Sequence, residues 1–249
     1  VALRHERARI MGLPTAADHL LANTMAGNVA TVMDFLTRGL RSYKPAAESY
    51  LAKVRACAGD EIDELHPWDI KYYGRKLKES LYKVEMEAFR PYLELNNTLK
   101  ALRAHARAAF GVDLRPAPRG KYPVHNSDVR VHEAFNAASG SFIGLFYANY
   151  YARAGAKEGG AWMDELQSHY VDEDGCTHTP AITNDCNFRK NADGTPTLLG
   201  LEDGETVFHE FGHAMHGLLT EAKYKSQAGT RVRRDFVELP SQLQEEWFH

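Results

Sequence analysis

The sequence lacks the features that mark several specialised classes of protein. None of its apolar runs approaches the about 18 residues that a membrane-spanning helix needs, so we expect no membrane partner. Its 30 basic and 33 acidic residues leave a formal net charge of −3, and this balance gives no support to a nucleic-acid partner. The three cysteines, Cys57, Cys176 and Cys186, are too few and too scattered for a disulfide framework.

The cysteine count and the two ends of the chain suggest where the protein resides. An odd number of cysteines fits a reducing compartment, and the charged residues near the start leave no apolar segment typical of a signal peptide. We therefore predict a cytoplasmic protein. Because the chain begins at Val1 and stops at His249 within a helical pattern, we interpret it as a piece truncated at both ends, and we expect the missing remainder of the same protein as a partner.

Helical periodicity dominates the chain up to about residue 110. One face is marked by Val29, Val32, Met33, Leu36 and Leu40, and similar stripes run over residues 70–81 and 95–110. We predict that region 1–110 is helical. Most of the apolar side chains in these stripes are expected to lie in a core.

The pattern changes after residue 110 and changes back after residue 200. Prolines mark a loop near residues 116–123, and residues 141–151 and 181–188 are rich in the aromatic and branched side chains of strands. We predict a β-rich region at 111–200 that contains a hairpin, and helices at 201–249. The expected fold is mainly α with a small antiparallel β-sheet (α+β), and the three regions are expected to form one continuous partial domain.

The segment His209-Glu210-Phe211-Gly212-His213 carries the chemistry of the chain. On a helix, residues four apart are rotated by only about 40° and lie about 6 Å apart along the axis, so both imidazoles can reach one ion. The intervening Glu210 can then accept a hydrogen bond from a water on that ion. Two neutral imidazoles and a carboxylate, with a fourth position open to water, suit zinc.

This five-residue pattern arises by chance in roughly one such chain in twenty. The surrounding residues here are apolar, however, and two half-buried histidines without partners would be costly polar groups. We therefore predict one zinc ion per chain.

The spacing of the residues leaves the third ligand open. His216 lies about 10.5 Å along the helix from His209, too far to share the ion, and is interpreted as a packing residue or as one that supports the ligands. Glu221 is a candidate on the same helix. A better source is the segment that follows, where Asp235, Glu238, Gln242 and Glu245 share one helical stripe. Spacing alone does not choose Glu238 over Asp235 and Glu245 together.

The zinc region closely resembles that of the thimet oligopeptidase, oligopeptidase A and peptidyl-dipeptidase family of zinc metallopeptidases. The resemblance rests on residues 208–216, on Gly229-Thr230 and on residues 235–242. Further landmarks follow in family order, among them residues 68–73, 128–131, 144–147, 159–163 and 186–188. It covers nearly the whole chain.

The resemblance implies a zincin-type core in which His209, His213 and Glu238 bind zinc and Glu210 activates water. Asp235 and Glu245 are expected to support the ligands, on the evidence of the stripe. The family cleaves short peptides. The strand around Gly144 and Tyr147 and the backbone of Gly159 and Gly160 are expected to hold such a peptide by strand addition.

The chain also departs from the family. It lacks the amino-terminal helical region and the carboxy-terminal segment whose tyrosines and histidine contact the substrate, so we expect a complete metal site within an incomplete catalytic site. Two alternatives stay open: an oligoendopeptidase F-like enzyme or helical zinc carboxypeptidase, and a segment that binds zinc or peptides without turnover.

Overall fold

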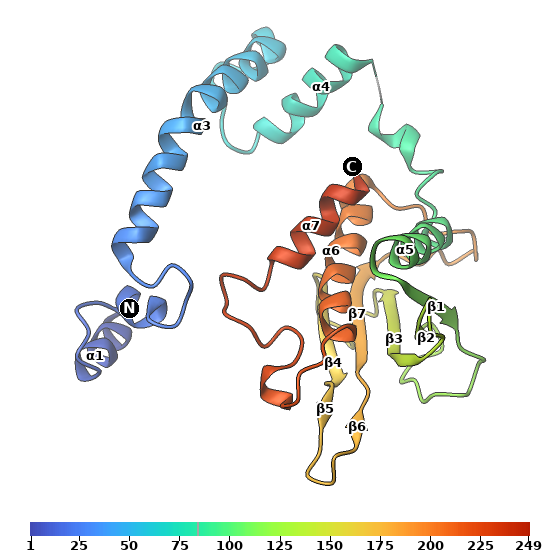
Figure 1. Ribbon diagram of the computed structural model, residues 1–249. Coiled ribbons are helices and arrows are strands. Elements are labelled where there is room, and N and C mark those ends of the chain that lie inside the picture. Colours follow the sequence, from blue (N-terminus) through green and yellow to red (C-terminus); the bar gives the residue numbers. More distant parts are fainter. Residues whose placement is uncertain (84) are drawn as a thin grey trace. The chain divides into compact units, whose positions relative to one another are not determined.

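A computed structural model describes residues 1–83 and 85–249, which fall into two compact units, Val1–Ala88 and Phe89–His249. Unit 1 is helical and contains α1 (Ala2–Ile10), α2 (Ala16–Leu21), α3 (Val29–Ala58), the short η1 (Gly59–Glu61) and α4 (Ile70–Tyr82) (Figure 1). The brief η2 (Met86–Phe89) follows at its end.

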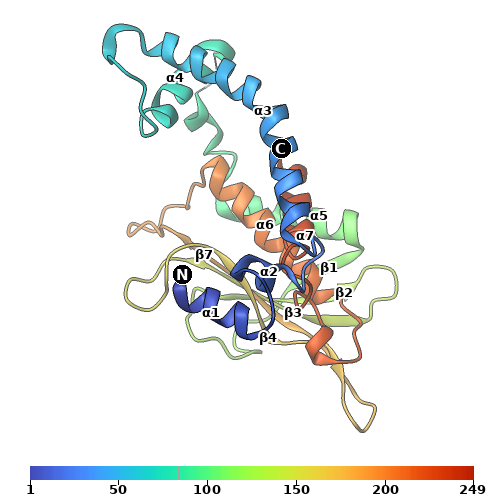
Figure 2. The same cartoon turned by 90° about the vertical axis from the view of Figure 1, so that its left-hand side faces the viewer.

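Helix α3 is long and largely exposed (Figure 2). It begins after Asn28, whose Oδ1 accepts a hydrogen bond from the backbone N–H of Thr31 at 2.9 Å. The predicted periodicity of residues 29–40 is confirmed, but the expected burial is wrong, because Met33, Leu36 and Leu40 are 55%, 55% and 64% exposed. The small core of unit 1 lies elsewhere, where Val54, Ala58 and Tyr73 pack together.

Unit 2 combines helices with a mixed sheet. Its helices are α5 (Leu95–Phe110), α6 (Leu201–Leu218), η3 (Lys225–Gln227) and α7 (Leu239–Phe248). The main sheet has the order β1 (Val112–Pro116), β2 (Arg130–Asn136), β3 (Phe142–Tyr151), β7 (Ala181–Phe188), β4 (Trp162–Gln167). The short strands β5 (Tyr170–Val171) and β6 (Thr177–His178) form a hairpin that extends beyond this sheet in both views (Figure 1, Figure 2).

The prediction of an antiparallel sheet is wrong in one pairing. Neighbours pair antiparallel except β3 and β7, which run parallel from the pair Leu145–Ala181 to the pair Tyr151–Phe188. The chain leaves β3, forms β4 and the β5–β6 hairpin, and returns as β7 between β3 and β4. This crossover makes β4 an edge strand of the sheet, which a plain succession of hairpins would not do.

Helix α6 covers one face of the sheet and carries the largest part of the core. Its buried residues pack against alternate residues of β3 and β7, including Phe146, Ala148, Ile182 and Cys186. Gly217 permits this close approach, since a Cβ there would lie 2.7 Å from Cδ1 of Ile182. Figure 1 shows α6 beside β7 and β4, with α7 next to it.

The last helix begins later than its periodicity suggests. We expect a start near Asp235 or Phe236, but residues 234–238 form turns and α7 begins at Leu239. Pro240 explains the difference, because proline is tolerated in the first helical turn and not further along. Glu238 therefore occupies the N-cap of α7 instead of its interior.

Candidate metal centre

The two histidines of the motif project from α6 toward one point. The N-cap of the helix is Gly200, whose N–H donates to Oδ2 of Asp203 at 2.9 Å, and the apolar stripe of α6 fixes its rotation on the sheet. His209 and His213 follow one turn apart, with ring centroids 5.0 Å apart and ring planes at 82°. The predicted helical setting of the motif is confirmed.

Glu238 meets both imidazoles from the start of α7. Its Oε2 lies 3.3 Å from Nε2 of His209 and 3.1 Å from Nε2 of His213, and it accepts a hydrogen bond from Oγ of Ser241 at 2.9 Å. The three candidate ligand atoms all lie within 4.8 Å of one another. Two ligands at about 2.05 Å from a tetrahedral zinc are separated by about 3.3 Å, so these spacings suit one ion.

Hydrogen bonding on the far side of His209 supports the same interpretation. Its Nδ1 lies 2.5 Å from Oε1 of Glu245. Because a carboxylate accepts, Nδ1 carries the proton, and the Nε2 atom of a neutral ring then points its lone pair at the carboxylate of Glu238. Two lone pairs facing each other repel unless a cation lies between them. The donor set thus fits a divalent metal, and Glu245 orients one ligand as carboxylates commonly do.

Glu210 lies beside this cluster and is 5% exposed. Burial raises its pKa to about 7, and the carboxylates of Glu238 and Asp185 act in the same direction, while His209 acts against them. A bound cation would lower this pKa. Oε2 of Glu210 is buried without a hydrogen-bond partner among the described residues, and the residue lines the pocket at the cluster.

A pocket of about 290 Å³ opens at the cluster. Helix α6 contributes His209, Glu210 and His213. The other lining residues come from the start of β4 and from the loop between α6 and α7, namely Ala161, Trp162, Met163, Thr230, Val237 and Glu238. An edge strand therefore lies directly beside the candidate metal ligands.

The position of β3 corrects the expectation for Gly144 and Tyr147. Both edges of β3 are occupied, one by β2 and the other by β7, so this strand has no free edge for a peptide. Gly144 has a structural reason instead, because a Cβ there would lie 2.3 Å from the carbonyl oxygen of Pro180. Tyr147 is 8% exposed.

Gly159 and Gly160 lie in the exposed loop directly before β4. The carbonyl oxygens of Glu158 and Gly160 accept hydrogen bonds from Nδ2 of Asn187, at 2.6 Å and 2.8 Å, and Gly160 has φ +98°. Within the described chain, β4 pairs with β7 alone. The outer edge of β4, more than the two glycines, is the backbone available to an extended peptide.

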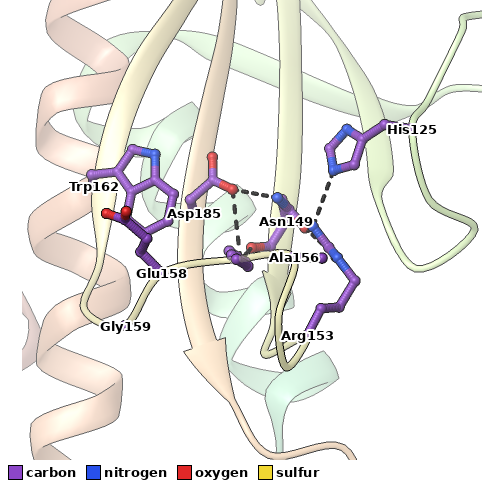
Figure 3. A pocket seen from close by; sticks show the side chains of 9 residues that line it. His125, Asn149, Arg153, Ala156, Glu158, Gly159, Trp162 and Asp185 are labelled. Carbon is purple, nitrogen blue, oxygen red and sulfur yellow. Dashed lines mark hydrogen bonds and ion pairs between the residues drawn. The ribbon is translucent and has the colours of Figure 1, made fainter.

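Trp162 also lines a second pocket, of about 340 Å³ (Figure 3). The side chain of Lys157 is buried, and its Nζ donates hydrogen bonds to the carbonyl oxygens of Asn149, at 2.5 Å, and Cys186. The same Nζ lies 3.6 Å from Oδ1 of Asp185. Burial lowers the pKa of Lys157. Arg153 bridges Oδ1 of Asn149 and Nε2 of His125. These contacts hold the loop that leads into β4.

The remaining predicted residues stand apart from the cluster. Asp235 is exposed in the turn before Glu238 and is not among the three clustered residues. His216 also lies outside the cluster, with its ring centroid 6.5 Å from that of Phe236. The supporting role of Asp235 stays a prediction.

Sequence reasoning missed two buried polar residues behind Glu210. Asn184 on β7 and Tyr150 on β3 are 0% and 3% exposed, and their side-chain polar atoms have no partner with hydrogen-bond geometry among the described residues. Burial raises the pKa of Tyr150, and the carboxylate of Glu210 adds to it. The one available signal was Asn184 itself, a polar residue on the apolar side of an alternating strand.

No helix in the described chain is long and apolar enough to cross a membrane.

The family model of Peptidase family M3 matches residues 1–249. Similar curated proteins include "Oligopeptidase A" of Escherichia coli (strain K12), 38% identical over 250 residues. Others are "Dipeptidyl carboxypeptidase" of the same strain, 34% identical over 251 residues, and "Probable cytosolic oligopeptidase A" of Arabidopsis thaliana, 37% identical over 256 residues. These alignments cover 98–99% of this chain and 36% of each relative.

Proposed function

The chain belongs to Peptidase family M3, and from this premise we propose that it is the zinc-binding part of a cytoplasmic metallopeptidase that hydrolyses short peptides. The predicted family resemblance is confirmed. The observation that carries the proposal is the convergence of His209, His213 and Glu238 within 4.8 Å, beside a buried Glu210.

The proposed roles follow from the positions of the side chains. His209, His213 and Glu238 hold the ion, and Glu245 keeps His209 in the tautomer whose Nε2 is free to bind. When bound, zinc supplies polarisation of a peptide carbonyl and a lowered pKa of water. Glu210 accepts the proton of the attacking water at its carboxylate and passes it to the leaving amine.

The outer edge of β4 is the proposed docking strand for the substrate. An extended peptide that pairs with Trp162–Gln167 gains main-chain hydrogen bonds without regard to its side chains, which suits an enzyme acting on varied short peptides. Because β4 borders the pocket at Ala161, Trp162 and Met163, such a peptide passes next to the candidate ligands.

The relatives' names leave the mode of cleavage open. One is named an oligopeptidase and another a dipeptidyl carboxypeptidase. Mapping the products from an unstructured peptide distinguishes the two modes, because release of carboxy-terminal dipeptides alone indicates the second. A comparison of this chain with the intact protein tests the alternative of a segment that binds without turnover.

The central test is Glu210→Gln in the intact protein. We expect one zinc per chain by elemental analysis, as in the parent, and a fall in kcat of at least about 100-fold, because the general base is lost. Glu205→Gln, the same change at a partly exposed position on α6, is the matched control and should leave kcat unchanged. Turnover at the parent's rate by the Glu210 variant would refute the mechanism, and a parent without zinc would refute the site.

A further inference from the structure

An ion pair joins β4 to the loop between α6 and α7, two segments that both contribute residues to the metal pocket. Arg231, in the loop between α6 and α7, donates through Nη1 to Oε2 of Glu165 on β4 and, at 2.8 Å, to Oγ of Ser168. Ser168 in turn donates to the same carboxylate oxygen. The side chain of Glu165 is 5% exposed. We refer to Arg231, Glu165 and Ser168 as the Arg231 cluster.

The backbone of the same loop is packed against this carboxylate. Gly229 has φ +53°, and a Cβ at this position would lie 2.1 Å from Oε1 of Glu165. The left-handed φ favours glycine, and the absence of a side chain lets the Glu165 carboxylate approach the backbone closely. Charge and shape together fix residues 229–231 to the end of β4.

The fixed segment leads directly to the third candidate ligand. Thr230 lines the metal pocket, and the loop continues to Val237 and Glu238, which line it as well. On its other side Glu238 is held by Oγ of Ser241 and by the contact of α7 with Gly212. The carboxylate of Glu238 is 53% exposed, so burial does little to hold it in place.

We propose that the Arg231 cluster positions Glu238 against the two histidines and thereby sets how tightly the site retains zinc. The inference rests on the proposed metal site and adds a determinant of its affinity. A basic residue near a peptidase site could instead grip the carboxylate of a substrate. The Nη1 atom of Arg231 is already committed to Glu165 and Ser168, which favours the positioning role.

The test compares Arg231→Met, Arg231→Lys and Arg234→Met in the intact protein. Zinc affinity is measured by competition with a chromogenic chelator, and the zinc-induced rise in Tm is measured separately. We expect Arg231→Met to bind zinc about 10- to 100-fold more weakly, as losses of supporting contacts commonly do. Arg231→Lys should be intermediate, because lysine keeps the charge without the planar fork.

Arg234→Met is the matched control, since it removes the same charge from the same loop at an exposed position. It should bind zinc within about twofold of the parent, given that surface charges act weakly. An equal loss of zinc affinity in this control would show that the loss arises from the change in net charge, and it would overturn the proposal. Unchanged zinc affinity in Arg231→Met, with a raised KM, would also overturn it and assign Arg231 to the substrate.

A second variant guards against failure to fold. Arg231→Met leaves a buried carboxylate without its cationic partner, whereas Glu165→Gln combined with Arg231→Met removes both charges. Without zinc, the Tm of the double variant should lie closer to the parent's Tm than that of Arg231→Met does. The zinc-induced rise in Tm of the double variant should still be smaller than the parent's. A full rise would contradict the positioning role. A parent that shows no rise would instead reject the proposed metal site, so the two failures are distinguishable.

Discussion

The crossing of α6 and α7 at Gly212 offers a sharp test of how the candidate metal site is assembled. An added Cβ at Gly212 would lie 2.6 Å from both the carbonyl oxygen of Pro240 and the Cα of Ser241. These are backbone atoms, which cannot rotate away as a side chain would. Gly212→Ala therefore requires α7 to move.

The size of the movement follows from the contact distances. Ordinary contacts of a Cβ begin at 3.4 Å, so α7 must retreat by about 0.8 Å, at a cost of about 1–3 kcal/mol for overpacking. Glu238 precedes Pro240 by two residues and moves with it. Because metal–ligand distances tolerate only about 0.2 Å, we expect zinc affinity to fall about 10- to 100-fold.

The assay is again zinc competition in the intact protein, accompanied by Tm without zinc. Gly39→Ala is the matched control, since Gly39 lies within α3 and a Cβ there would meet nothing within 4 Å. That change should stabilise the protein by about 0.5–1 kcal/mol through helix propensity and leave zinc binding unaltered. The same substitution, glycine to alanine, is thus expected to destabilise the protein at position 212 and to stabilise it at position 39. Parental Tm and parental zinc affinity in Gly212→Ala would refute the reasoning.

Two further predictions concern the ligands and the pH dependence of stability. Glu238→Ala should weaken zinc binding far more than Glu245→Ala, because the first removes a candidate ligand and the second only the partner of Nδ1 of His209; equal zinc contents by elemental analysis would contradict this. Burial, and then Arg103 and Arg130, lower the pKa of His132 from 6.5 to about 4, so the unfolded chain binds the extra proton first. In zinc-free parent protein, His132 should lower the free energy of unfolding by about 3 kcal/mol as the pH falls from about 6.5 to 4, and His132→Leu should abolish this decrease. Denaturant unfolding at pH 7 and pH 4 measures the difference. Identical pH dependence in parent and variant would show that His132 does not titrate as expected.

Local regularities account for what could be predicted in the fold and the candidate site. The helical spacing of Leu95, Leu99, Leu102 and Ala106 indicates both a helix and its buried face, because 3.6 residues per turn is a property of the local backbone. The same geometry places His209 and His213 side by side with Glu210 next to them. The strands at residues 142–151 and 181–188 were likewise visible from composition.

Periodicity was misleading where burial depends on partners distant in the sequence. The stripe of Met33, Leu36 and Leu40 is as regular as that of α5, yet it is exposed. An amphipathic pattern indicates which face of a helix is apolar, but it does not indicate whether another element packs against that face.

By itself, the sequence determined the helical setting of the motif, the residue types of the candidate metal ligands and the membership of the chain in its family. Only the tertiary structure decided that β7 inserts between β3 and β4, that β4 rather than β3 offers a free edge, and that Arg231 is bound to Glu165. It also decided that Glu238 reaches both imidazoles from a helix N-cap. The physical reason is that strand order and helix crossing are set by packing between residues far apart in the chain, which no local pattern encodes.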